Sequence, residues 1–177
     1  MTTPRETAGH TGSMGTPESR APIRIERATE GDIPIVLQMI RDLAEYERML
    51  PDVVATEAGL REALFSAKPD AEVIIACDGD EPAGFALFFH NFSTFVGRRG
   101  LYLEDLFVKP AFRGQGIGKR LLVELARMAI ARGCGRFEWA VLDWNEPAIG
   151  FYEALGAKRL LDWQICRLDA AALARLS

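Results

Sequence analysis

Residues 101–118 read LYLEDLFVKPAFRGQGIG, and this stretch decides the fold. Its first eight residues are apolar or aromatic except for Glu104 and Asp105, the composition of a central β-strand. Its last six residues carry glycine at positions 114, 116 and 118, directly before an amphipathic run. A glycine-rich turn between a strand and a helix predicts a phosphate-binding loop, because the backbone can approach the anion closely. A purely structural turn is the alternative, since the segment is neither GxGxxG nor a Walker loop.

Apolar periodicity on both sides of this stretch predicts alternating helices and strands. Upstream, the predicted elements are a strand at 23–27, a helix at 33–49 stopped by Pro51, a helix from Thr56, and a strand hairpin at 72–77 and 83–90 followed by a loop at 91–100. Downstream, they are a helix closed by Arg132-Gly133, a strand at 136–142, a helix at 147–155 and an extended segment at 157–168 that could form two short strands. This order predicts one α/β domain.

Composition narrows the class of protein. Residues 1–21 have almost no apolar side chains and are predicted to be a disordered tail, which leaves 22–177 as the folded domain. A net charge of -4 argues against a nucleic-acid partner, and no apolar run is long enough to span a membrane. The three cysteines have no metal-binding spacing, so no metal is expected. These features predict a cytoplasmic protein with reduced thiols.

Two motifs together resemble those of the GNAT acetyltransferases. The segment 113–118 matches the family's Q/R-x-x-G-x-G/A signature, and the segment 145–157, with Phe151-Tyr152, matches its second signature. The similarity covers about 23–168 and is closest to the branch of the spermidine/spermine and thialysine acetyltransferases. This resemblance implies a mixed, mostly antiparallel sheet flanked by about four helices and splayed at its central strands to hold acetyl-CoA.

The resemblance also implies a set of cofactor-binding residues. In similar proteins the CoA pyrophosphate lies against the glycine loop, and the pantetheine pairs with the end of the preceding strand. Carried over to this sequence, the set is Leu106, Phe107, Val108, Arg113, Gly114, Gln115, Gly116, Ile117, Gly118, Lys119, Asn145 and Tyr152. Two of them have simpler alternatives: Asn145 as an ordinary helix cap before Pro147, and Lys119 as a solvated residue at a helix start.

The chemistry of acetyl transfer to an amine requires a base and an acid. An amine with a pKa near 10.4 is neutral in only about one molecule in a thousand at pH 7, so a base must remove its proton. Glu104 matches the family's base position, and its expected burial would raise its pKa; a structural ion pair is the alternative. Asp105 is expected on the opposite face of a regular strand. Tyr152 stands at the family's acid position, with simple packing beside Phe151 as the alternative.

The amine substrate is predicted from acidic positions. Glu47 resembles the substrate-side carboxylate of diamine acetyltransferases and, with Glu104, is predicted to bind the substrate; a solvated helix residue is the alternative for Glu47. Ser93 stands where the polyamine pattern carries an acid. Arg98 and Arg99 would repel a polycation and attract a carboxylate. A short amine such as thialysine is therefore favoured over spermidine.

The predicted function is acetyl-CoA-dependent N-acetylation of a small-molecule primary amine by direct transfer in a ternary complex. Two other functions stay open: acetylation of a protein N-terminus or lysine, and non-catalytic sensing of acyl-CoA. Members of the branch that the sequence resembles are usually dimers, so the resemblance implies a homodimer. Trp163 and Ile165, which alternate with polar neighbours in the C-terminal segment, are the candidates for an intersubunit strand. Packing of that segment within one subunit is the alternative.

Overall fold

The computed structural model describes residues 22–176. The predicted tail at 1–21 lies outside the described residues, so that prediction remains untested. The chain divides into two compact units, one that ends at Glu138 and one that begins at Trp139, and each unit is described by itself.

Five strands form one open, mixed sheet in which the spatial order follows the chain. The strands are β1 (Arg24–Arg27), β2 (Glu72–Asp78), β3 (Glu81–Ser93), β4 (Arg98–Val108) and β5 (Phe137–Trp139). The pairs β1–β2, β2–β3 and β3–β4 are antiparallel. The three antiparallel pairs and the open sheet agree with the predicted α/β architecture, and β4 is the strand expected from the sequence.

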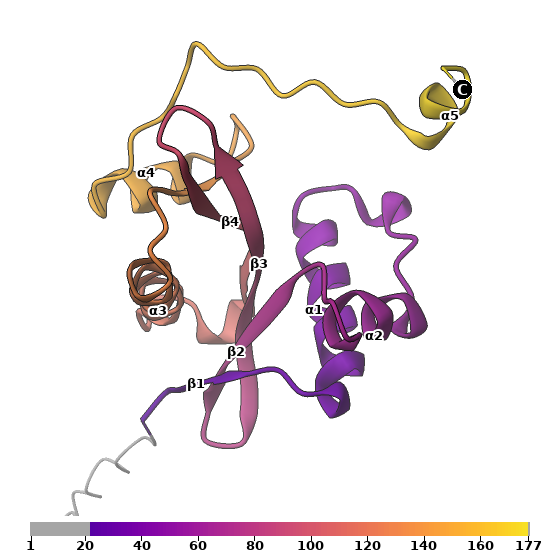
Figure 1. Cartoon of the computed structure of the whole chain (residues 1–177). Coiled ribbons are helices and arrows are strands. Elements are labelled where there is room, and N and C mark those ends of the chain that lie inside the picture. The colour runs from indigo at the N-terminus through magenta and orange to yellow at the C-terminus, as the bar shows by residue number, and fades with distance from the viewer. Residues whose placement is uncertain (1–21, 177) are drawn as a thin grey trace, which may run out of the picture. The chain divides into compact units, whose positions relative to one another are not determined.

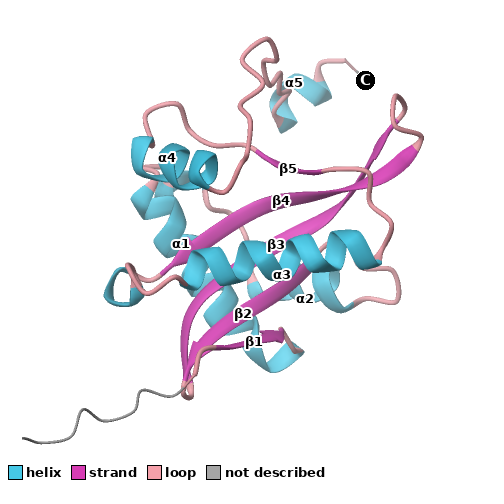
Figure 2. Cartoon of the chain, turned by 90° about the vertical axis from the view of Figure 1, so that its left-hand side faces the viewer, coloured by secondary structure: helices cyan, strands magenta, loops and turns pink. Residues whose placement is uncertain are grey.

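Helices cover both faces of the sheet in the first unit. They are α1 (Ile33–Tyr46), α2 (Glu57–Phe65) and α3 (Ile117–Ala131), with short 3-10 turns at Glu30–Asp32, Leu50–Asp52 and Pro110–Phe112. Helices α1 and α2 lie on one side of the sheet and α3 on the other (Figure 1). Figure 2 shows α3 crossing the strands from the side opposite to α1. The core between α1 and the sheet includes Val36, Met39, Phe85 and Phe107, all buried. This packing anchors the second half of β4.

The second unit contains α4 (Glu146–Ala154) and the short α5 (Ala170–Ala174). The Asn145 side chain accepts a hydrogen bond from the Ala148 N–H at 3.3 Å, which caps α4. No strand forms between residues 156 and 169 within the described chain, so the two short strands suggested by the sequence there are absent. Helix α5 was not expected from the sequence.

Three predicted boundaries were wrong. The predicted loop at 91–100 is mostly strand, because Ser93 pairs with Arg98 and the hairpin turn is short. Sheet pairing satisfies the backbone of these polar residues and overrides their weak strand propensity. The strand expected at 136–142 is limited to β5, and α1 ends at Tyr46 instead of near Met49.

Candidate active site

A β-bulge interrupts β4 at Glu104. Leu87 of β3 pairs with Asp105 and the next residue, Phe88, pairs with Leu103, so Glu104 is the extra residue on β4. Bulges bend a strand and redirect side chains, and they are common beside active sites. Glu104 is exposed, so the expectation that it would be buried was wrong. The strict alternation expected for Glu104 and Asp105 is also broken at this point.

Asp105 is the carboxyl group that the fold removes from water. The pKa of Asp105 is raised to about 6, mainly by burial and additionally by the negative charges of Glu104 and Glu47. Desolvation and like charges both disfavour the ionised form of a carboxyl group. Phe107, two residues further along β4, packs in the core with α1, so Asp105 faces the same side of the sheet as α1. The sequence analysis predicted that Glu104, and not Asp105, would be the buried carboxyl group with a raised pKa.

The end of α1 brings Glu47 to the same region. The N–H groups of Arg48 and Met49 donate back to carbonyl groups of the last helical turn at 3.1 and 2.7 Å. Arg48 adopts a left-handed conformation with φ of 62°, which is uncommon for a residue other than glycine. This tight ending keeps Glu47 half-buried, and burial raises the pKa of its carboxyl group. The electrostatic effect of Glu47 on Asp105 shows that the two carboxyl groups lie close enough to interact.

An arginine links the end of α1, the end of β4 and the glycine loop. The Arg113 guanidinium lies 5.0 Å from the centre of the Tyr46 ring and 5.7 Å from that of Phe107. Its Nε donates to the Val108 carbonyl at 3.0 Å. Cation–π contacts of this kind hold the guanidinium in place between the end of α1 and the end of β4. Tyr46 was not assigned a role from the sequence; its position next to Glu47 was the only signal.

The glycine loop has the backbone geometry that a phosphate cradle requires. Gly114 and Gly116 have φ of 75° and 76°, and a Cβ added at either would meet no atom within 4 Å. Gly116 is the N-cap of α3, and no side chain among residues 22–176 caps that end. The first N–H groups of α3 therefore have no intrahelical partner. These features fit a bound pyrophosphate, which these N–H groups and the glycine backbone would hold.

The other predicted loop residues occupy different environments. Ile117 is buried, Gln115 and Gly118 are half-buried, and Lys119 is exposed at the start of α3. The Gln115 side chain donates to the Ala111 carbonyl at 3.4 Å, which steadies the loop. The backbone and not these side chains therefore forms the candidate cradle.

The end of β4 is paired on its β3 side. Leu106, Phe107 and Val108 pair with Ala86, Phe85 and Gly84. Since β4 has 11 residues and β5 has only 3, β5 can accompany only part of β4. Phe107 is buried in the core, whereas Leu106 and Val108 are half-buried. A cofactor that pairs with this strand end would therefore use its backbone.

Tyr152 lies in an aromatic cluster of the second unit. Its ring centre is 5.0 Å from that of Trp139 in an edge-on arrangement and 5.3 Å from that of Phe151. Tyr152 is half-buried, and Asn145 is buried at the start of the same helix. The packing of Tyr152 beside Phe151 and the helix cap of Asn145 are thus both present. Trp139 is a part of this cluster that sequence reasoning missed.

Comparison with known proteins identifies the class. Residues 38–157 match the pattern of the Acetyltransferase (GNAT) family. A thialysine N-epsilon-acetyltransferase from Sus scrofa is 38% identical over 168 residues, covering 89% of this chain and 98% of the relative. An L-ornithine N5-acetyltransferase from Arabidopsis thaliana is 33% identical, covering 85% and 86%. A solved structure of an integron cassette protein from V. cholerae superimposes with a TM-score of 0.73 at 29% identity, covering 87% and 96%.

The chain belongs to the GNAT family and is an acetyltransferase. Within the family, its relatives place it in the diamine and thialysine branch, as predicted from the two motifs. Members of the family use acetyl-CoA as co-substrate. Among residues 22–176, no helix is both long and apolar enough to cross a membrane, and no three His, Cys, Asp or Glu residues gather as metal ligands would.

Proposed function

We propose that this acetyltransferase modifies the terminal primary amine of a small diamine or of a lysine-like amino acid such as thialysine or ornithine. The observation that carries the proposal is the acidic region formed by Glu47 at the end of α1 and by Glu104 and Asp105 on β4. Carboxylates hold an ammonium group by charge-assisted hydrogen bonds. The names of the relatives, which refer to thialysine and ornithine, support the same class of substrate.

The charge of the acidic region favours a cationic amine. Glu47 and Asp105 both have raised pKa values because burial disfavours their ionised forms. A cationic amine that enters this region compensates the like charges, so binding and ionisation of the carboxyl groups reinforce one another. Arg98 and Arg99 do not serve the carboxylate of the same substrate, because the stretch of β4 from Arg99 to Asp105 spans roughly 20 Å at about 3.3 Å per residue.

The proton of the attacking amine goes to a carboxylate of β4. Glu104 stays the base predicted from the family resemblance, and its exposure leaves room for a linking water. Asp105 is the second candidate, because a base with a pKa of about 6 is better matched to neutral pH than an ordinary aspartate. Glu104 is the bulged residue and Asp105 follows it directly on β4, so both carboxyl groups belong to the same acidic region.

The glycine loop of the first unit and Tyr152 of the second unit keep the roles that the family resemblance implies for them. Acetyl-CoA, when bound, supplies the acetyl group as a thioester. The backbone N–H groups at 114–118 would hold the pyrophosphate, with Lys119 adding positive charge, and the strand end at 106–108 would orient the pantetheine arm. In the second unit, Asn145 is the residue that the resemblance assigns to the same arm. The phenolic oxygen of Tyr152 holds a proton for the leaving group, since a phenol has a pKa near 10.

The pH dependence of the reaction distinguishes the two candidate bases. A plot of log kcat/KM against pH is expected to break at about pH 6, with lower activity on the acidic side, where Asp105 is protonated. The break should disappear in Asp105→Asn and persist in Glu104→Gln if Asp105 is the titrating group. A break that persists in Asp105→Asn and disappears in Glu104→Gln assigns it to Glu104 instead.

The substitution Asp105→Asn, which should lower activity if Asp105 is the base, is expected to raise the stability of the fold. The folded-state pKa of Asp105 is above the ordinary value of 3.8, so the folded protein binds more protons between pH 4 and 6 and loses stability as pH rises through that window. Asp105→Asn removes this penalty and is expected to stabilise the fold at pH 8 by about 1–3 kcal/mol. Thermal unfolding of the parent and of Asp105→Asn at pH 8 measures this change. The same experiment is the control for folding, because a variant that is at least as stable as the parent cannot lose activity through unfolding.

A panel of amines tests the proposed substrate class. Thiol release from acetyl-CoA is expected with thialysine, lysine, ornithine or putrescine, and less with spermidine or a generic peptide. Glu47→Gln should raise KM for the preferred amine by about tenfold, equal to about 1.4 kcal/mol of lost binding, with little change in kcat. Glu45→Gln removes the same charge from an exposed position two residues earlier and should change neither value.

The panel also decides between the proposed function and its alternatives. Release only with the peptide would support acetylation of proteins, and binding of acetyl-CoA without release by any amine would support an acyl-CoA sensor. Either result contradicts a small-molecule acetyltransferase.

A homodimer and a cytoplasmic location remain predictions. The C-terminal segment supports the dimer: Trp163 is 74% and Ile165 is 73% exposed, and such a row of large apolar side chains is a typical site of protein association. Sedimentation velocity of the full chain measures the oligomeric state, and a single monomeric species at micromolar concentration would contradict the dimer.

A further inference from the structure

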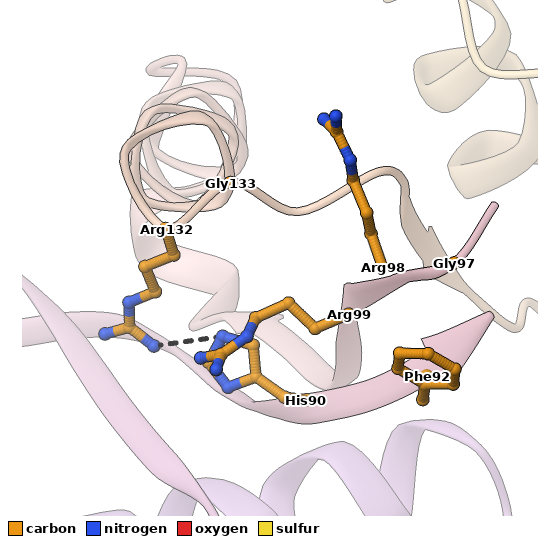
Figure 3. Close-up of a pocket in the computed structure, with 7 residues that line it drawn as sticks. All are labelled: His90, Phe92, Gly97, Arg98, Arg99, Arg132 and Gly133. Carbon is orange, nitrogen blue, oxygen red and sulfur yellow. Dashed lines mark hydrogen bonds between the residues drawn. The ribbon is translucent and has the colours of Figure 1, made fainter. Parts of the chain in front are cut away.

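A hollow lies at the opposite end of β4 from the acidic residues. It has a volume of about 670 Å³ and lies between the end of β3, the start of β4 and the C-terminal end of α3. Its cationic or titratable lining residues are His90, Arg98, Arg99 and Arg132 (Figure 3). No acidic side chain lines it among the described residues. The hollow is therefore positively charged in a protein with a net charge of -4.

The charges around the hollow are only partly neutralised. Glu72 of β2 forms a two-point ion pair with Arg132, through Oε1 to NH1 and through Oε2 to NH2, the second at 2.8 Å. Glu72 also lies 3.3 Å from the Arg27 guanidinium, so it is shared between two arginines. Within the described chain, no ion pair joins Arg98 or Arg99 to a carboxylate. Arg132 offsets the partial negative charge at the C-terminal end of α3.

The pKa of His90 reflects the positive charges around the hollow. This pKa is lowered by burial first and then by the charges of Arg132 and Arg99, against a smaller opposite effect of Glu72. Arg132 NH1 lies 3.4 Å from His90 Nε2, and since a guanidinium only donates, Nε2 must accept in the neutral imidazole. Figure 3 shows the Arg99 and Arg132 side chains converging on His90, whereas Arg98 extends away toward the rim.

Two distances, one along β4 and one along α3, separate the hollow from the residues proposed for acetyl transfer. Arg99 is roughly 20 Å from Asp105 along β4, as calculated above. Arg132 and Gly116 flank opposite ends of α3, whose 15 residues extend about 22 Å at about 1.5 Å per residue. A lysine-like amine bound near Asp105 reaches neither Arg99 nor Arg132.

We propose that the hollow lined by His90, Arg99 and Arg132, with Arg98 at its rim, is a second binding site for a small anion that carries two or more carboxylate or phosphate groups. Guanidinium groups bind both kinds of group through paired hydrogen bonds. One anionic group lies between Arg99, Arg132 and His90, and a further group reaches Arg98. The negative charge of the bound anion neutralises the arginine charges that the carboxylates of the described residues leave uncompensated.

The test uses the two histidines of the chain, His10 and His90, as paired NMR reporters. The full-length protein is titrated with citrate and, separately, with inorganic pyrophosphate, each against sodium chloride at the same ionic strength. Because the anion opposes the field of Arg99 and Arg132, we expect a saturable rise in the pKa of His90 and no matching change at His10. The comparison of citrate with pyrophosphate shows whether carboxylate or phosphate groups bind better.

Matched variants assign the effect to the hollow. Arg99→Gln is expected to weaken anion binding at least tenfold. Arg127→Gln removes an exposed arginine of α3 that forms an ion pair with Glu124, and it should leave anion binding unchanged. Gly116→Ala should also leave it unchanged, which excludes binding at the glycine loop as the source of the signal. The proposal is overturned if chloride shifts His90 as much as citrate and pyrophosphate do, or if Arg99→Gln binds both anions as tightly as the parent. None of these readouts depends on acetyl transfer.

Discussion

Replacing Tyr152 by Phe is expected to lower kcat by roughly 10²- to 10⁴-fold, the usual effect of removing a general acid. The substitution removes only the phenolic hydroxyl and preserves the ring that packs against Trp139 and Phe151. KM for acetyl-CoA should therefore change much less than kcat. Steady-state thiol release with the preferred amine measures both constants.

Two controls separate proton donation from packing. Thermal unfolding of Tyr152→Phe should match that of the parent within about 1 kcal/mol, because the apolar contacts are retained. Phe151→Leu disturbs the same aromatic cluster without removing a hydroxyl and should retain most of the activity. If Tyr152→Phe keeps more than half of the parent kcat, Tyr152 is a packing residue and the acid lies elsewhere.

Replacing Gly116 by Ala is expected to raise KM for acetyl-CoA by at least about tenfold, with a smaller effect on kcat. The new Cβ projects into the open space at the N-terminus of α3, where the proposed pyrophosphate lies. The left-handed backbone at this position, with φ of 76°, adds a stability cost of about 1 kcal/mol. Binding of CoA by calorimetry and initial rates at varied acetyl-CoA measure the effect.

Gly79→Ala is the matched control for this prediction. Gly79 has φ of 61° in the turn between β2 and β3, and a Cβ there also meets no atom within 4 Å. The two substitutions therefore introduce similar backbone strain, but only one of them is in the glycine loop. Equal KM values for acetyl-CoA in the two variants would show that the loop around Gly116 does not bind the cofactor.

The glycine loop and its flanking elements are predictable from the sequence because their requirements are local. Positive φ at Gly114 and Gly116 needs glycine, and the apolar repeat that follows specifies α3 wherever it is placed. The apolar run of β4 likewise has the composition of a buried strand. For the same reason the two motifs predicted the family correctly.

The arrangement of the carboxyl groups depended on tertiary structure. Pairing with β3 creates the bulge at Glu104, and a bulge follows from the register of two strands and not from either strand alone. This register exposes Glu104 and faces Asp105 toward α1. The raised pKa of Asp105 follows from burial and from the approach of Glu47, which is far away in the sequence.

The class of enzyme, the glycine loop and the order of helices and strands as far as α4 could be predicted from the sequence alone, since each depends on residue type and spacing along the chain. Only the tertiary structure decided which carboxyl group is desolvated and how His90, Arg99 and Arg132 come together at the far end of the sheet. Electrostatic interaction depends on distance through space and on exclusion of water, and neither quantity is encoded locally.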